Sequence, residues 1–113
     1  MASHEEFMEY VREQTRGAGA MSFRRMFGEY ACYLDGKVVA FVCDDQFYLK
    51  PTEAGRAAIG TPVLAPPYPG AKPYFRLDAA LEDPDEMAHL LRVTAAALPP
   101  PGPKRKARGR RGQ

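Results

Sequence analysis

The sequence predicts a two-layer α+β domain in which an antiparallel β-meander sheet is packed by N- and C-terminal helices. Two tight turns divide the apolar stretch of residues 29–50, as expected for short antiparallel strands. Residues 4–16 and 84–98 instead carry apolar side chains at helical spacing. A chain of 113 residues has room for one such domain. We expect residues 1–98 to form it and residues 99–113 to be a disordered Pro/Arg/Lys-rich basic tail.

A first helix is predicted over residues 4–16. Ser3 and Glu6 form a capping-box pattern at its start. Gly17 and Gly19 end it, because glycine is the commonest helix terminator. The side chains at helical spacing between these signals are Phe7, Tyr10, Val11 and Gln14.

Two residue pairs predict the turns of the meander. Asp35-Gly36 is the stronger, because a type I′ turn needs positive φ at both central residues and Asp-Gly accepts this readily. Asp44-Asp45 is a weaker candidate for the same turn. The register that follows pairs Leu34 with Lys37, Tyr33 with Val38, Ala31 with Ala40, Val42 with Phe47, and Ala40 with Leu49.

This register gives the meander two apolar faces, because side chains alternate along a strand. One face is predicted to carry Ala31, Tyr33, Val38, Ala40, Val42, Phe47 and Leu49. The other is predicted to carry Cys32, Leu34, Val39, Phe41, Cys43 and Tyr48. A sheet that is apolar on both faces must be covered on both, by helices or by another protein surface, so the pattern predicts a partner surface.

The flanking segments predict the outer strands. Residues 22–27 and residues 74–77 each read as a further strand. The segment 61–73 between the two halves contains five prolines, so we expect it to be irregular.

Two more helices are predicted in the second half of the chain. Thr52 can cap a short helix over residues 53–59, which Gly60 ends. Asp83 followed by Pro84 gives an N-cap and a proline at the first helical position. The apolar face of this last helix is formed by Met87, Leu90, Leu91, Thr94, Ala95 and Leu98.

The charges are divided unevenly along the chain. Residues 1–98 hold ten Lys/Arg and fourteen Asp/Glu, a net charge of −4. Residues 99–113 hold no acid and a net charge of +6, a pattern typical of a tail that binds phosphates. The alternative is a solubilising tail with weak, non-specific affinity. The six cations are Lys104, Arg105, Lys106, Arg108, Arg110 and Arg111.

Short patterns in the tail and at the N-terminus bear on partners and location. The segment PPGPKR, residues 100–105, fits a PxxPxR ligand pattern. The first ten residues lack the charged and apolar regions of a signal peptide. The longest apolar run, residues 38–43, is far too short to span a membrane. We therefore expect a cytoplasmic protein with reduced thiols.

Candidate reactive residues are few. Cys43 beside Asp44 could be a nucleophile with His4 or His89 as its base, but it lies at a predicted hairpin end and outside any catalytic signature. Cys32 and Cys43 with the two histidines match no zinc-binding spacing. In the predicted register Cys32 faces Val39, which disfavours a disulfide. We therefore expect no catalytic residue, metal or cofactor.

The stretch SFRRMFGEYACYLDGKVVAFVCDDQFYLK, residues 22–50, resembles the N-terminal domain of the TfoX/Sxy family. The similarity extends over about residues 3–97. It lies in Arg24, Met26, Phe27 and Gly28, in Tyr33 to Lys37, in Asp44, Asp45 and Phe47 to Lys50, and more faintly in Pro73 to Phe75 and Glu82 to Pro84.

The resemblance implies a two-layer fold with helices on an antiparallel sheet, in agreement with the meander. It also implies a bacterial regulator of natural competence, since full-length members act as co-activators with the cyclic-AMP receptor protein. No catalytic residue or cofactor is associated with the family. Full-length members carry a second helical domain where this chain has its basic tail.

Three functions follow as expectations. The first is a non-enzymatic regulatory module that binds a transcription factor or its own copy through an apolar sheet face. The second is a nucleic-acid-associated protein that binds phosphates through its tail, and the third is an enzyme that uses Cys43. We expect no membrane association and infer no small-molecule substrate. The residues expected at the partner surface are Arg24, Arg25, Val39, Phe41 and Tyr48.

Overall fold

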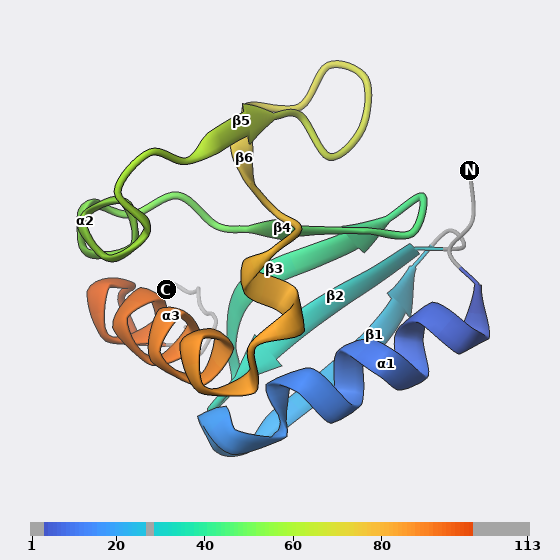
Figure 1. The fold of residues 1–113 in the computed structure, drawn as a ribbon. Coiled ribbons are helices and arrows are strands. Elements are labelled where there is room, and N and C mark those ends of the chain that lie inside the picture. Colours follow the sequence, from blue (N-terminus) through green and yellow to red (C-terminus); the bar gives the residue numbers. More distant parts are fainter. Residues whose placement is uncertain (1–3, 27–28, 101–113) are drawn as a thin grey trace, which may run out of the picture.

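Across the described residues, 4–26 and 29–100, a six-stranded antiparallel sheet forms one layer and the helices form the other (Figure 1). These residues are described from a computed structural model. The order of the strands in the sheet is β1-β2-β3-β4-β6-β5. They are β1 (Met21–Met26), β2 (Glu29–Leu34), β3 (Lys37–Cys43), β4 (Gln46–Leu49), β5 (Val63–Ala65) and β6 (Tyr74–Leu77).

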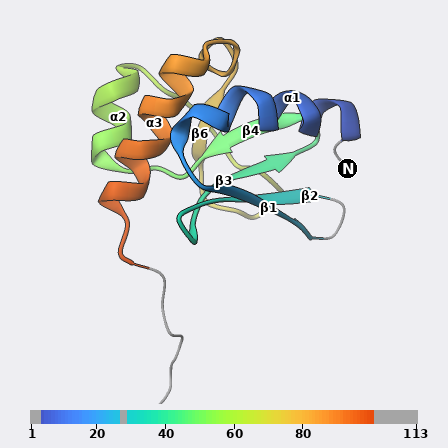
Figure 2. The ribbon, with the colours of Figure 1, turned by 90° about the horizontal axis from the view of Figure 1, so that it is seen from below.

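The helices gather on one side of this sheet. They are α1 (Glu5–Thr15), α2 (Glu53–Ile59) and α3 (Pro84–Ala97), with short 3₁₀ turns η1 (Arg16–Ala18) and η2 (Ala80–Glu82). In the view from below, the helices lie along the upper side and strands β1, β2 and β3 along the lower side (Figure 2). The predicted two-layer α+β fold is confirmed, and one face of the sheet carries no helix among the described residues.

Both predicted tight turns are confirmed. Asp35 and Gly36 have φ of 53° and 82°, and Asp44 and Asp45 have φ of 53° and 57°. The second turn therefore places two non-glycine residues in the left-handed region, which aspartate tolerates better than most residues. The two turns make β2, β3 and β4 a continuous meander.

The predicted register is correct near each turn but wrong in the middle of β2. Tyr33 pairs with Val38, yet the next residue of β2, Cys32, pairs with Ala40. Val39 is thus an extra residue in β3, which forms a β-bulge. The predicted pairing of Ala31 with Ala40 is wrong, because a bulge cannot be recognised from apolar spacing alone.

The bulge exchanges the faces of β2 residues relative to the prediction. Cys32 and Leu34 lie on the helix side, while Ala31 lies on the opposite face. Val39 is fully buried in the core, so it cannot belong to the partner surface where we expected it.

The core lies between the helices and the helix-side face of the sheet. Its largest fully buried side chains include Phe47 and Leu49 of β4, Phe75 of β6, and Leu90 and Leu91 of α3. Most of the predicted apolar face of α3 is buried. Burial of large apolar side chains on this scale is the main favourable term in folding.

The capping residues predicted from the sequence are confirmed at the starts of α2 and α3. Thr52 accepts a hydrogen bond from the Gly55 N–H at 3.0 Å, and Asp83 accepts from the first turn of α3, as predicted. At α1 the N-cap is His4, whose side chain makes no cap hydrogen bond. Ser3 lies outside the described residues, so its predicted capping role is not described.

The segment with five prolines is more regular than expected. Val63–Ala65 forms β5, the last strand of the sheet, paired with β6. The prediction of an irregular segment was wrong here, because prolines at 62 and 66 flank the strand rather than interrupt it, and an edge strand tolerates them. β6 itself matches the predicted strand over residues 74–77.

Polar side chains tie the helices to the sheet and to each other. The Lys37 ammonium donates to the carbonyl oxygens of Ala95 at 2.8 Å and Leu98 at 3.3 Å, at the C-terminal end of α3. The Arg92 guanidinium donates to the carbonyls of Gly17 and Ala18 in η1. Both cations donate to carbonyl groups at the ends of helical segments, where carbonyls have few partners within the helix.

Candidate functional site

The sheet face opposite the helices, called the outer face here, carries a row of directly paired residues that crosses every strand. The register places an aromatic pair, Phe41 and Tyr48, between two arginines, Arg24 and Arg76. Paired residues on neighbouring strands share one face. The complete row is Arg24, Ala31, Phe41, Tyr48, Arg76 and Val63.

Three of the five expected partner-surface residues therefore lie together. Arg24, Phe41 and Tyr48 belong to the row, and Arg24 is exposed. Arg25 is also exposed, but it pairs with Tyr30 and lies in the next row, on the helix side of the sheet. Val39 is in the core.

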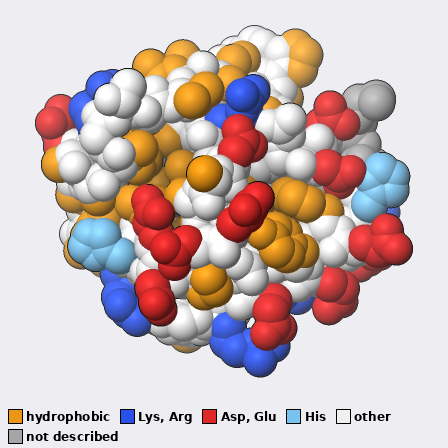
Figure 3. Space-filling model, in the orientation of Figure 1, with side chains coloured by type: hydrophobic (Ala, Val, Ile, Leu, Met, Phe, Trp, Pro, Cys, Tyr) orange, Lys and Arg blue, Asp and Glu red, His pale blue; other side chains and the backbone are white. Residues whose placement is uncertain are grey.

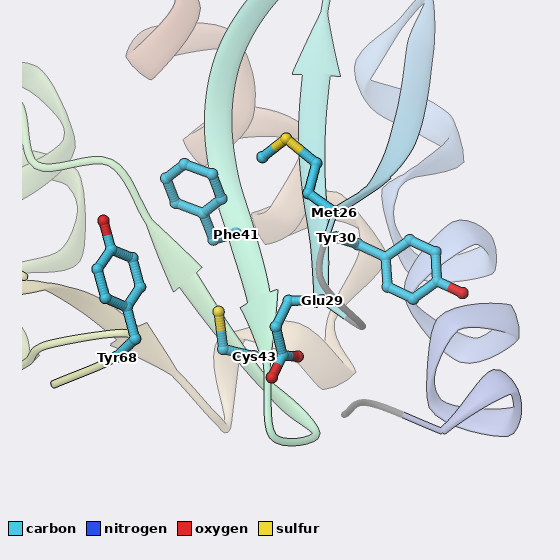
Figure 4. Close-up of a pocket in the computed structure, with 6 residues that line it drawn as sticks. All are labelled: Met26, Glu29, Tyr30, Phe41, Cys43 and Tyr68. Carbon is cyan, nitrogen blue, oxygen red and sulfur yellow. The ribbon is translucent and has the colours of Figure 1, made fainter. Parts of the chain in front are cut away.

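A pocket of about 430 Å³ opens beside this row, and we call it the outer pocket. Figure 4 shows the side chains of Met26, Phe41, Cys43 and Tyr68 around the hollow. Tyr30 borders it as well, but its ring extends toward α1, where its hydroxyl donates to Glu5 at 3.1 Å. The walls are almost entirely apolar, and the volume lies in the range of ligand pockets.

The only charged side chain that lines the outer pocket among the described residues is Glu29. Its carboxylate accepts a hydrogen bond from the Asp44 N–H at 3.2 Å. This contact ties the start of β2 to the β3–β4 turn. The outer pocket thus combines apolar and aromatic walls with negative charge at one end.

The loop between β5 and β6 completes the outer pocket. Its Tyr68 is 57% exposed although it contributes a wall. Next to the outer pocket, the rings of Phe41 and Tyr74 lie in a tilted arrangement with centroids 5.6 Å apart. Sequence reasoning missed Tyr68, because a tyrosine between prolines gives no periodic signal. The unusual combination of an aromatic residue with a Pro-rich loop was the available hint.

The two cysteines have opposite locations but similar chemistry. Cys43 faces the outer pocket, and burial, followed by the charge of Glu29, raises its pKa to about 11. Cys32 is enclosed in the core, and burial raises its pKa to about 12. Both thiols are free. A nucleophilic cysteine needs a lowered pKa, which is the opposite of what the surroundings of Cys43 produce.

The histidines considered as bases do not serve Cys43. The His4 backbone N–H donates to the Asp45 carboxylate at 2.7 Å, and its ring Nδ1 contacts the same carboxylate. This contact raises the pKa of His4 and lowers that of Asp45. His89 is exposed on α3, in the helix layer. In the described part of the chain, no three His, Cys, Asp or Glu side chains are grouped as a metal site would require.

The helix side of the molecule is rich in acidic side chains (Figure 3). It also holds a smaller pocket of about 200 Å³, here called the helix-side pocket, between α1, β4 and η2. Its walls include Phe7, Tyr10, Asp78 and Glu82. The acidic residues of α1 and of the segment before and at the start of α3 are Glu5, Glu6, Glu9, Glu13, Asp78, Glu82, Asp83, Asp85 and Glu86.

The six cations of the tail, Lys104 to Arg111, lie outside the described residues. In the described ranges, no helix is both long enough and apolar enough to cross a bilayer.

Comparison with known proteins gives two matches. The sequence model described as the TfoX N-terminal domain matches residues 13–98. A relative from Spirochaeta aurantia, described as an uncharacterized 12.7 kDa protein in the trpE 5′ region, is 46% identical over 105 residues. That alignment covers 93% of this chain and 91% of the relative.

Proposed function

The chain belongs to the TfoX N-terminal domain family, and on this premise we propose that it is a non-enzymatic regulatory module whose outer face binds a protein partner. The observation that carries the proposal is the outer face, which no helix of the described residues covers and where Phe41 and Tyr48 lie between two arginines beside an apolar pocket. Buried aromatic anchors with flanking arginine are typical of the energetic centres of interfaces.

Family membership supports a regulatory role over catalysis. We propose a cytoplasmic protein that contacts a transcription factor or a second copy of itself, in the manner of competence regulators. The raised pKa of Cys43 supports the non-enzymatic part, since few thiolates are available at neutral pH.

Affinity capture with matched variants tests the protein-binding proposal. Arg24→Glu reverses an exposed charge in the outer-face row, while Arg16→Glu reverses an exposed charge at the end of α1. We expect a specific partner to bind the unchanged chain and Arg16→Glu but not Arg24→Glu. Equal capture by all three chains would contradict a site on the outer face. Size-exclusion chromatography with light scattering, applied to the same chains, reports whether the partner is a second copy.

The division of charge favours a second candidate function, in which the tail binds nucleic acid. A globule with a net charge of −4 repels phosphates, whereas a tail with +6 attracts them. If all six cations contacted duplex DNA, the slope of log K against log salt would approach about −5.

A tail-neutral variant tests this second candidate. It replaces Lys104, Arg105, Lys106, Arg108, Arg110 and Arg111 by Gln in the full chain. Titration of fluorescent duplex DNA at several salt concentrations should show binding by the unchanged chain and none by the variant. Equal binding by both chains would refute a role for the tail.

A further inference from the structure

We propose that the protein partner of the outer face presents an acidic segment with one large apolar side chain. This side chain inserts into the outer pocket, while carboxylates of the segment bind Arg24 and Arg76. The inference rests on the proposed function, because it names the class of partner for the same face. Three observations carry it, namely the charges around the outer face, its exposed apolar side chains and the spacing of the two arginines.

The charges around the outer face favour an acidic partner. On β1 the row begins with the exposed Arg24. The segment of β5, β6 and their loop, residues 61–77, holds Lys72 and Arg76 and no acid. Glu29 lines the outer pocket at the end near the β3–β4 turn. A carboxylate is therefore attracted to the row and repelled by the Glu29 end and by the acid-rich helix side.

The guanidinium of Arg76 can take a further carboxylate. Its Nε is buried and makes no hydrogen bond among the described residues, and the Asp78 carboxylate lies 3.5 Å from it, at the limit of hydrogen-bond distance. The side chain is 35% exposed, so part of it is open to a partner. Because a guanidinium has five N–H donors, Arg76 can bind a second carboxylate while it keeps its contact with Asp78.

The outer pocket provides a place for the apolar side chain of the partner. Met26 is 39% and Tyr68 is 57% exposed, although both line the outer pocket. An inserted side chain would meet the Met26 thioether and the rings of Phe41 and Tyr68, which surround the hollow (Figure 4). Tyr74 packs beside Phe41, so this wall is formed before a partner arrives. A volume of about 430 Å³ accommodates a tryptophan or tyrosine, the residues most frequent at energetic centres of interfaces.

The positions of the two arginines set the spacing of acids in the partner. Arg24 on β1 and Arg76 on β6 are four strand-to-strand steps apart, through β2, β3 and β4. At about 4.8 Å a step, their backbone positions are roughly 19 Å apart. An extended segment advances about 3.3 Å per residue, so about six residues cover this distance. The outer pocket lies beside the middle of the row, around Phe41 and Cys43, so the apolar side chain belongs between the acids.

Nucleic acid is the main alternative ligand for the two arginines. Grooves that bind single strands follow the phosphates with a continuous track of cations. On the outer face an aromatic pair separates Arg24 from Arg76, and the acidic Glu29 lies in the adjoining pocket. This arrangement suits an acidic protein segment with an apolar residue better than a phosphate backbone. A basic segment would instead suit the helix-side pocket, which Asp78 and Glu82 line.

Titration with fluorescent peptides tests the inference. The protein is the full-length tail-neutral variant, because the six cations of the unchanged tail would attract any acidic peptide. The probe peptide has a central tryptophan and two acidic residues at each end, over about seven residues. One control peptide has alanine in place of the tryptophan, and another has lysine in place of the acids. We expect the probe to bind, the alanine peptide to bind about tenfold more weakly or worse, and the lysine peptide not to compete with the probe.

Matched substitutions in the tail-neutral variant locate the bound probe. Arg24→Glu should weaken its binding about fivefold or more, because an attractive contact becomes repulsive, whereas Arg16→Glu should change it less than about twofold. Tyr68→Ala should weaken it about threefold or more, and Tyr10→Ala, in the helix-side pocket, should leave it unchanged. At 1 M salt, where the screening length is about 3 Å, the effect of Arg24→Glu should shrink while that of the tryptophan remains. Urea denaturation checks that the variants are folded.

Four outcomes would overturn the inference. The first is that the probe does not bind, or binds no better than the alanine peptide. The second is that Arg24→Glu and Arg16→Glu have the same effect. The third is that the lysine peptide binds more tightly than the probe and is lost in Tyr10→Ala, which would place the ligand in the helix-side pocket. The fourth is that single-stranded DNA binds the tail-neutral variant more tightly than the probe and is lost in Arg24→Glu, which would assign the arginines to phosphates.

The result for the proposed function is obtained separately. A partner captured by the unchanged chain but not by Arg24→Glu, together with no binding of the probe, would overturn the acidic segment and keep the protein-binding proposal. Binding of the probe in the expected pattern without any captured partner would keep the chemistry of the outer face and overturn the proposed regulatory role.

Discussion

Asp45 illustrates how much a single residue contributes at the end of the meander. It takes up a left-handed conformation with φ of 57°, and its carboxylate accepts the backbone N–H of His4. The same carboxylate contacts the His4 ring. One turn residue therefore holds the start of α1 against the β3–β4 turn, a contact that joins residues 41 positions apart.

The His4–Asp45 pair should be visible in a titration. The pKa of His4 is raised above 6.5, first by its hydrogen bond to Asp45, so its stabilising contribution is complete below 6.5 and is lost as pH rises through the raised pKa. The pKa of Asp45 is lowered below 3.8, so its contribution is complete above 3.8 and is lost as pH falls through the lowered value.

The pair is thus strongest between about pH 3.8 and 6.5. Asp45→Asn should return the pKa of His4 toward 6.5, as measured by NMR of the ring protons. Because His4 is exposed, high salt should shrink the difference. An unchanged His4 pKa in Asp45→Asn would contradict the contact, and Asp44→Asn is the matched control.

Thiol chemistry gives a second prediction for single residues. With a pKa of about 11, roughly one Cys43 thiol in 10⁴ is ionised at pH 7, so alkylation should be slow in the folded protein. The rate should rise with pH up to about 11, and Cys32, fully enclosed, should react last. Mass spectrometry of alkylated peptides measures both sites. Fast labelling of Cys43 at neutral pH would revive the enzyme hypothesis.

Lys37 stands out among the contacts between secondary-structure elements. It lies at the start of β3, yet its ammonium caps the C-terminal end of α3 through two carbonyl groups. A cation at a helix C-terminus also interacts favourably with the helix dipole. The β2–β3 turn and the last helix are therefore coupled through one side chain.

Lys37→Met keeps the length of the side chain and removes its hydrogen bonds to the carbonyls of Ala95 and Leu98. We expect a loss of about 1.5–3 kcal/mol in the free energy of unfolding, because hydrogen bonds to charged groups contribute on this scale. Urea denaturation measures it. Lys72→Met, at an exposed loop position, should change stability by less than about 0.5 kcal/mol. Equal effects of the two substitutions would argue against the cap.

The fold was largely predictable from local signals, because caps, turns and apolar spacing each specify an element by themselves. Thr52, Asp83 and the Asp35-Gly36 pair are examples that the structure confirms. The bulge at Val39 and the strand β5 were missed. Both depend on pairing with distant residues, which leaves no periodic trace in the segment concerned.

The candidate site was predictable only in part for the same reason. Arg24, Phe41 and Tyr48 could be expected on a sheet surface, and they do share one row. The outer pocket needed the position of the β5–β6 loop, and Tyr68 reaches it from more than twenty residues away along the chain. Only the fold of the whole sheet brings these residues together.

At the scale of the whole molecule, one face of the sheet forms the core with the helices, and the other face is the proposed partner surface. The helix side of the sheet is enclosed by α1, α2 and α3, while on the outer face the edge residues Arg24 and Val63 are exposed and the central residues Ala31, Cys43 and Tyr48 are buried. Substitutions on the two faces should therefore have different consequences.

Phe47→Ala and Tyr68→Ala compare the two faces directly. Phe47 is fully buried in the core, so its truncation should cost about 3–5 kcal/mol in the free energy of unfolding. Tyr68 lies in an exposed loop, and its truncation should cost less than about 0.5 kcal/mol. Urea denaturation of both variants measures the difference. A large loss of stability in Tyr68→Ala would show that the loop belongs to the folding core.

Val39 is an extra residue in β3, and it shifts the pairing of β3 with β2 by one position. Relative to Ala40, Val42 and β4, the residues of β2 lie on the opposite face from the one that simple alternation assigns. Deleting position 39 would restore alternation and bring Ala31 to the helix side in place of Cys32 and Tyr30. Insertion or deletion of one residue can therefore exchange interior for surface along a whole strand, a change that substitutions would make only by altering several residues.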